Sequence, residues 1–196
     1  METASLDRLI ETLLRDLKRL YLADVDRLNH IYGVRDTALR LAKIHRLDNR
    51  KVLLASYLHD MTKAEDEAFH AHIITRVYDA SVLETTPPPL WHAYSAAALA
   101  RTRYGVNDED VLRAVESHTV GRAAMSTLEA VLFISDYIEP NRLYPSCVAA
   151  REMAFIDLNK AVHYAIDRSI RFHERKGFLV PEAAYEARNH YERSMR

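Results

Sequence analysis

Residues 51–63 read KVLLASYLHDMTK, and this stretch decides the fold of the chain. Its run VLLASYL is almost continuously apolar, so we expect a helix over about 51–61 that is buried on most sides. The pair His59-Asp60 ends this helix. A carboxylate at the end of an apolar helix is costly to bury unless a cation compensates it. A metal ion is one such cation.

The sequence outside this stretch also has helical periodicity. From Ser5, the expected N-cap, to about Leu47, apolar residues recur at spacings of three and four, with a bend near 21–26. Pro87-Pro88-Pro89 predicts that no helix continues through these residues. Asp48-Asn49 is the expected cap of the 51–61 helix. The further expected helices are a short one near 73–77, 90–104, one that Asn107 or Asp108 caps and that runs to about 117, 126–138, 147–155, 157–176, and one after Pro181. Gly105 and Gly177 would end two of them, and Ser126 with Glu129 would form a capping box.

The composition excludes several classes of protein. With 196 residues, 48% of them hydrophobic, the chain suits one domain over 1–196, with a helix over 1–24 packed on the remainder. Four glycines and six prolines are too few for a turn-rich β or doubly wound fold, so we predict an all-α helical bundle. The net charge of −1 gives no general attraction to nucleic acid. One cysteine, with no signal-like or membrane-spanning apolar run, predicts a cytoplasmic protein without a membrane partner.

Ten histidines are a surplus for a chain of this length, and histidine is the commonest metal ligand. Three of them, with one aspartate, lie at expected helix ends or on apolar faces, where an unpaired polar group is costly. They are His30, His92, His118 and Asp136. Together with His59-Asp60 they would form a nitrogen and oxygen donor set that suits Fe, Mn, Zn, Co or Ni. Without a thiolate, this set is unlike a structural zinc site.

This order of His, His-Asp, His, His and Asp on a helical chain resembles the HD-domain metal-dependent phosphohydrolases. Four phrases resemble one branch of them, the YqeK-type symmetrical diadenosine tetraphosphatases. The phrases are LHDMTK at 58–63, HTVGR at 118–122, MSTLE at 125–129 and SDYIEPNR at 135–142. The resemblance covers about 25–190 and implies a single HD-type helical domain.

The resemblance also implies a binuclear site and its reaction. Asp60 would bridge two metal ions, and each of the other implied ligands would bind one ion: His30, His59, His92, His118 and Asp136. Iron is the implied metal, with Mn, Co, Ni and Zn as alternatives. The implied reaction is symmetrical hydrolysis of diadenosine tetraphosphate to two ADP by a metal-activated water. The implied catalytic residues are Asp60, Lys63 and Arg122, and the implied substrate contacts are Lys63, Thr119, Arg122 and Arg142.

Other functions stay open at this stage. The chain could be an HD-type nucleotidase with one metal ion acting on mononucleotides, or a nucleotide-binding HD module without catalysis. An RNA-binding helical protein is disfavoured by the charge. A homodimer is also open. The remaining histidines are expected to lie outside the site: His45, His70, His72, His163, His173 and His190.

Overall fold

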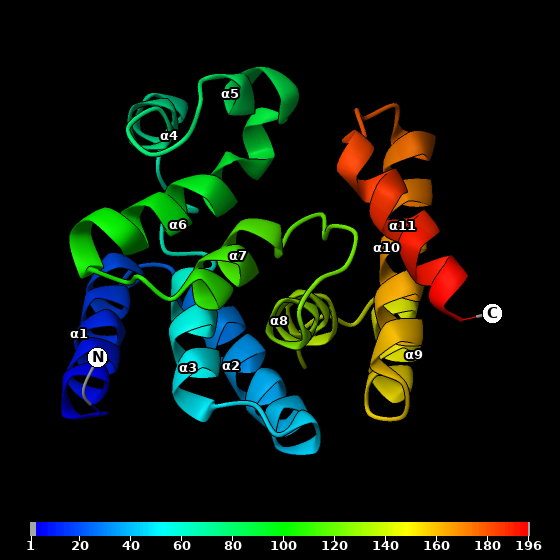
Figure 1. Ribbon diagram of the computed structural model, residues 1–196, viewed down its shortest axis with the longest axis horizontal. Coiled ribbons are helices and arrows are strands. Elements are labelled where there is room, and N and C mark those ends of the chain that lie inside the picture. Colours follow the sequence, from blue (N-terminus) through cyan, green and yellow to red (C-terminus); the bar gives the residue numbers. More distant parts are fainter. Residues whose placement is uncertain (1–2, 196) are drawn as a thin grey trace.

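The computed structural model describes residues 3–195 and is all-α over that range (Figure 1). The predicted fold class is therefore confirmed. Of the predicted domain, 1–196, residues 1, 2 and 196 lie outside the described residues. The elements in chain order are α1 (Thr3–Leu20), α2 (Val25–His45), α3 (Asn49–Leu58), α4 (Glu67–Ile74), α5 (Ser81–Thr85), the 3-10 helix η1 (Pro88–Leu90), α6 (Trp91–Tyr104), α7 (Glu109–Ser117), α8 (Thr127–Ile138), α9 (Pro145–Ala154), α10 (Leu158–Lys176) and α11 (Glu182–Ser194).

Helix α8 lies at the centre of the molecule. It packs against α2, α3 and α7 on one side and against α9 and α10 on the other, and Figure 1 shows it end-on between these groups. Its residues from Leu128 to Ser135 are all buried. A helix that is apolar around its circumference can exist in water only when other helices cover it on every side. The site residues at its C-terminal end are therefore surrounded by helices.

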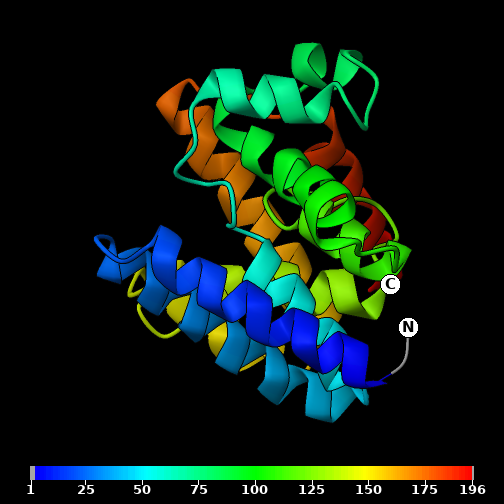
Figure 2. The ribbon, with the colours of Figure 1, turned by 90° about the vertical axis from the view of Figure 1, so that its left-hand side faces the viewer.

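The first three helices form one layer on this core. Leu13 and Leu17 of α1 are fully buried, and α1 packs on α3. Figure 2 shows α1 running across this layer, with α4 and α5 at the opposite end of the molecule. Within residues 3–195, every helix is too short or too polar to cross a membrane.

Several helix ends follow the capping residues that the sequence shows. Asp48, Asp108 and Ser126 are N-caps, and Ser126 forms the expected capping box with Glu129. Gly105 ends α6 in the left-handed conformation, with φ of 65°. These ends are local, because each of the three N-caps bonds to a backbone group within three residues of itself, and Gly105 N bonds to the Ala100 carbonyl five residues earlier.

Three expected boundaries are wrong. Helix α1 begins at Thr3, so Ser5 lies inside it and is not its N-cap. Helix α3 ends at Leu58 because the backbone then turns through i to i−3 hydrogen bonds, such as the one from Met61 N to Leu58 O. The region expected to hold one short helix has two, α4 and α5, since Asp66 accepts a hydrogen bond from Phe69 N and caps the first of them.

Candidate metal centre

The His59-Asp60 pair stands in the turn that ends α3. His59 is fully buried and Asp60 is 3% exposed. His59 Nδ1 lies 2.7 Å from the carbonyl oxygen of Ser56. A carbonyl can only accept, so Nδ1 carries the proton and Nε2 has a free lone pair.

The same local geometry fixes two more imidazoles. His92 stands in the first turn of α6, and its Nδ1 lies 3.0 Å from Pro89 O. His118 follows the last residue of α7, and its Nδ1 lies 2.7 Å from Val115 O. In each case the acceptor is the carbonyl three residues earlier. Metal-binding histidines generally donate their second ring nitrogen to such a group, which fixes the tautomer.

His30 is oriented by a side chain instead. It lies on α2, and its Nδ1 is 3.3 Å from Oε1 of Glu139, a residue that is 2% exposed. Its Nε2 is 3.1 Å from Asp136 Oδ1 but is not aligned for a hydrogen bond. Nε2 of His30 and Nε2 of His59 are buried without a hydrogen-bond partner among the described residues. Two orphaned lone pairs side by side fit a metal ion.

Asp60 is the centre of the cluster. Its Oδ2 lies 3.6 Å from Nε2 of His30 and 3.7 Å from Nε2 of His59. Its Oδ1 lies 3.5 Å from Nε2 of His92 and 3.9 Å from Nε2 of His118. Two sets of possible ligands therefore share this one carboxylate, and in each the candidate atoms lie within 4.8 Å of one another. All six predicted ligands lie together, with Asp136 at the His30 side.

The charges of the cluster suit metal binding. Burial lowers the pKa of His59 to about 4 and that of His92 to about 3, and it also lowers the pKa of His118. Burial opposes ionisation of Asp60, but the surrounding imidazoles outweigh it and hold the Asp60 pKa well below its usual value. For His30, burial is outweighed by Asp136 and Asp60, so its pKa is raised. Three imidazoles are thus neutral at neutral pH, the form that binds metal.

The predicted substrate contacts lie in two different places. Lys63 Nζ is 3.2 Å from His92 Nδ1, and Arg142 donates to Asp136 Oδ1 at 2.8 Å. Thr119 and Arg142 line a cleft that His118 and Asp136 also line. The guanidinium of Arg122, however, donates from Nε to Oε1 of the fully buried Glu129 at 2.6 Å, and Arg122 does not line the cleft. Its predicted contact with phosphate stays a prediction.

Sequence reasoning missed three polar neighbours of these ligands. Arg27 donates to Asp60 Oδ2 at 2.7 Å, and the buried Tyr21 hydroxyl donates to the Asp60 carbonyl at 2.7 Å. Glu139 is the third. Arg27 lies one helical turn before His30, a spacing that could have identified it. Glu139 lies inside the quoted phrase SDYIEPNR, whereas nothing in the sequence singles out Tyr21.

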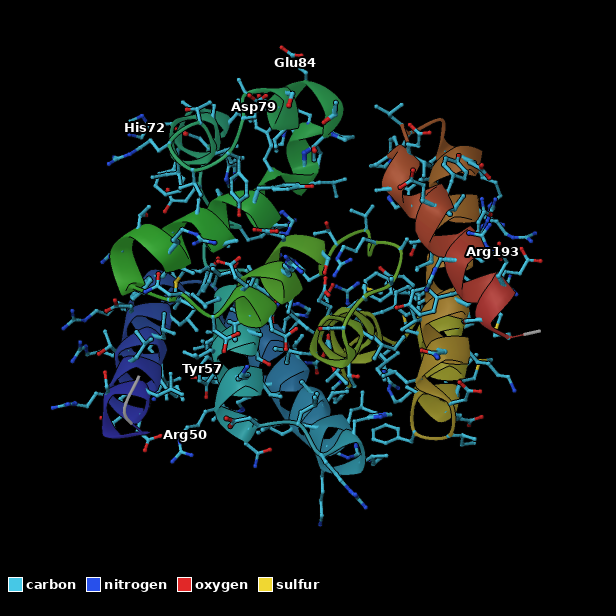
Figure 3. All side chains as sticks on the ribbon, viewed as in Figure 1. Arg50, Tyr57, His72, Asp79, Glu84 and Arg193 are labelled. Atoms are coloured by element: carbon cyan, nitrogen blue, oxygen red, sulfur yellow. The ribbon has the colours of Figure 1, made fainter. Side chains whose placement is uncertain are left out.

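His70 and His72 are two residues apart in the sequence, but this spacing does not bring their side chains together. His70 is buried and its Nδ1 lies 2.8 Å from Ser95 Oγ, whereas His72 is exposed and points away from α4 (Figure 3). They therefore do not form a metal pair. His173 lines the same cleft as His118, although the sequence places it outside the site.

The cleft has a volume of about 1060 Å³. Its walls come from the segment before α6, the end of α8, the start of α9, α10 and the segment before α11. A second, smaller cavity of about 460 Å³ lies on α1 and is lined by none of the predicted site residues.

Comparison with known proteins gives a consistent result. The HD domain family matches residues 27–141. The symmetrical bis(5'-nucleosyl)-tetraphosphatase of Bacillus subtilis is 38% identical over 147 residues, which are 75% of this chain and 79% of that protein. The protein of the same name from Staphylococcus aureus is 35% identical over 167 residues, 84% of this chain and 86% of that one.

A solved structure is similar over almost the whole chain. It is a crystal structure from Clostridium acetobutylicum, described as a predicted HD superfamily hydrolase involved in NAD metabolism. The two share 35% identity with a TM-score of 0.86, over 94% of this chain and 97% of that one. The helical arrangement of this chain is therefore also found in a protein solved by experiment.

Proposed function

Because this chain belongs to the HD-domain family, we propose that it hydrolyses diadenosine tetraphosphate symmetrically, releasing two ADP. The relatives named symmetrical bis(5'-nucleosyl)-tetraphosphatase support this substrate. The observation that carries the proposal is the position of Asp60, whose two carboxylate oxygens each face a pair of imidazole Nε2 atoms. A carboxylate placed in this way suits a pair of metal ions.

The proposal assigns the ligands to two ions that share Asp60. His30, His59 and Asp136 would hold one ion, and His92 and His118 the other. When bound, the ions would supply an activated water and neutralise charge on the phosphate oxygens. We carry iron over from the resemblance to this branch, and Mn, Co, Ni or Zn would also suit these donors.

The chain's own cations would position the phosphates. Lys63 beside His92 and Arg142 beside Asp136 stand close to opposite sides of the ligand cluster. Burial lowers the pKa of Lys63, while Asp136 raises that of Arg142. Cations held in place before the reaction stabilise charge that develops on phosphate oxygens. Thr119, which lines the cleft, would offer its hydroxyl to the same oxygens.

The test is a product assay on metal-loaded protein. Diadenosine tetraphosphate is added, and the nucleotides are separated by ion-exchange chromatography while bound metal is counted by mass spectrometry. Asp60→Ala should lose both turnover and metal. Asp36→Ala is the matched control, because Asp36 is an exposed carboxylate on α2 that pairs with Arg35. It should behave as the wild type.

The outcomes separate the alternatives. ADP as the sole product, with two ions per chain, agrees with the proposal. ATP plus AMP would contradict symmetrical cleavage. Hydrolysis of mononucleotides alone, with one ion per chain, would favour the nucleotidase. Nucleotide binding without turnover would favour the non-catalytic module.

The proposal also includes a cytoplasmic location and a homodimer. A single cysteine, which is buried, offers no intrachain disulfide and suits a reducing compartment. Cell fractionation tests the location, and light scattering on the purified protein tests the dimer.

A further inference from the structure

The cleft beside the metal centre extends well past the ligands. Besides His118 and Asp136, it is lined by residues of α10 and of the segment after it, including Phe178 and Leu179. Its volume of about 1060 Å³ is at the upper limit of the roughly 300–1000 Å³ common for small-ligand sites. It therefore has room for more than the phosphates at the metal ions.

The charges that line the cleft are mostly positive. Asp136 is its one carboxylate among the described residues, against Arg142, Arg168 and Arg175. Arg142 pairs with Asp136, but neither Arg168 nor Arg175 has an ion-pair partner in residues 3–195. Guanidinium groups that face a cleft without a carboxylate partner suit a phosphate ligand.

A neighbouring arginine on the same helix differs. Arg171 Nε pairs with Asp167 Oδ2 at 2.7 Å and does not line the cleft. The Arg168 guanidinium instead lies 5.1 Å from the centre of the Tyr164 ring, another cleft residue. The unpaired arginines of α10 are thus on its cleft side, and Arg171 offers a matched control.

The two arginines stand at different distances from the metal centre. Helices α9 and α10 pack against each other and are joined by a turn at 155–157, so they run antiparallel (Figure 1). Arg168 therefore lies near the start of α9, and α9 begins three residues after Arg142 in the chain. Arg175 lies seven residues further along α10, about 10 Å away at 1.5 Å per residue. The cleft thus has an inner and an outer cation.

Exposed aromatic rings also line the cleft. Tyr144 is 71% exposed, Phe172 47% and Phe178 59%, and all three line the cleft. Phe172 and Phe178 both contact the His173 ring, with centroids 5.5 and 6.1 Å away. We call Tyr144, Phe172 and Phe178 the aromatic rim. Exposed rings at the mouth of a cationic cleft are suited to stacking on a nucleobase.

We propose that this cleft binds one nucleoside diphosphate end of the dinucleotide, with Arg168 on its phosphates and the aromatic rim on its base. The inference rests on the proposed function for the dinucleotide. It goes beyond that function by locating one half of the substrate. The cleft is continuous with the metal centre, so a ligand in it places its phosphates next to Asp136 and Arg142.

The test measures binding and turnover separately. Titration calorimetry gives the affinity of metal-loaded protein for ADP and for pyrophosphate, which lacks a base. We expect Arg168→Ala to weaken both at least tenfold. The double variant Phe172→Ala/Phe178→Ala should weaken ADP at least fivefold and leave pyrophosphate unchanged. Both variants should raise KM for diadenosine tetraphosphate more than they lower kcat.

Two controls match these variants. Arg171→Ala removes an arginine from the same helix, and Ile156→Ala removes an apolar side chain that is 88% exposed and does not line the cleft. Both should bind ADP and turn over as the wild type does. Equal ADP affinity in Arg168→Ala, in the double variant and in the wild type would overturn the cleft assignment while leaving dinucleotide hydrolysis intact. A different outcome would be that Arg168→Ala loses ADP binding while the wild type does not hydrolyse the dinucleotide. That outcome would support the cleft assignment and reject the proposed function.

Discussion

Glu139 Oε1 lies 3.3 Å from Nδ1 of His30, across the contact between α2 and the end of α8. The other three imidazoles of the cluster have a backbone carbonyl at this position. Glu139 is itself held, because its Oε2 accepts a hydrogen bond from Asn141 N at 2.8 Å. The carboxylate thus orients the one imidazole whose helix offers it no carbonyl.

Gly33 makes room for this carboxylate, so Gly33→Ala is expected to weaken metal binding. A Cβ at Gly33 would stand 2.5 Å from Glu139 Oε2 and 3.3 Å from Cδ of Pro140. The carboxylate would have to move away from His30. Loss of the group that orients a metal-binding histidine typically costs 10–100-fold in affinity, and we expect about tenfold here. Metal titration of the metal-free protein measures it.

A second variant separates orientation from crowding. Glu139→Gln keeps the shape and an oxygen acceptor for His30 Nδ1, so it should retain more metal affinity than Gly33→Ala. Wild-type affinity in Gly33→Ala would contradict the orienting role of Glu139.

Arg122→Gln is expected to destabilise the protein. Glu129 is fully buried and receives hydrogen bonds from Arg122, from Ser117 Oγ and from Ser126 N. Removing one partner of a buried ion pair leaves an uncompensated charge, at a cost of about 3 kcal/mol. For a chain of this length that cost lowers Tm by about 10 °C, measurable by circular dichroism.

The double variant Arg122→Gln/Glu129→Gln should recover much of the stability, because it removes both charges. A wild-type Tm in Arg122→Gln together with a raised KM for the dinucleotide would instead support the contact with phosphate that the sequence predicts.

The ends of the helices could be predicted from the sequence where they depend on neighbours in the chain. Asp48, Ser126 and Gly105 are of this kind, and so are the short i to i−3 contacts that fix His59 and His118. The sequence also predicts the six candidate ligands, through the resemblance of their order to a family. Glu139 and Tyr21 were missed because each acts on a residue far away in the chain, 109 and 39 positions respectively. Only packing brings such pairs together, and no local pattern encodes it.

Metal loading is expected to raise Tm. Two buried imidazole nitrogens of the cluster have no hydrogen-bond partner in the described part of the chain, and three of its imidazoles are neutral at neutral pH. A ligand that binds only the folded protein stabilises it by about 2.7 kcal/mol at a free concentration of 100 Kd. That gain raises Tm by roughly 5–10 °C, which scanning calorimetry with and without a chelator would measure. Asp60→Ala should lose the shift, and an equal shift in Asp60→Ala would place metal binding elsewhere.

Tyr21→Phe is expected to weaken both the fold and the metal centre. The Tyr21 side chain leaves the end of α1, is 2% exposed, and donates its hydroxyl proton to the carbonyl oxygen of Asp60 at 2.7 Å. The variant keeps the ring but leaves that buried carbonyl without its donor, at a cost of about 1–3 kcal/mol. The Asp60 backbone would be held less firmly, so metal affinity should fall as well as stability. Chemical denaturation and metal titration of the same preparation measure the two effects.

Tyr32→Phe is the control, because Tyr32 lies on α2, is only partly buried, and forms no hydrogen bond with the ligand cluster. If Tyr21→Phe loses stability but keeps full metal affinity, α1 stabilises the domain without supporting the site.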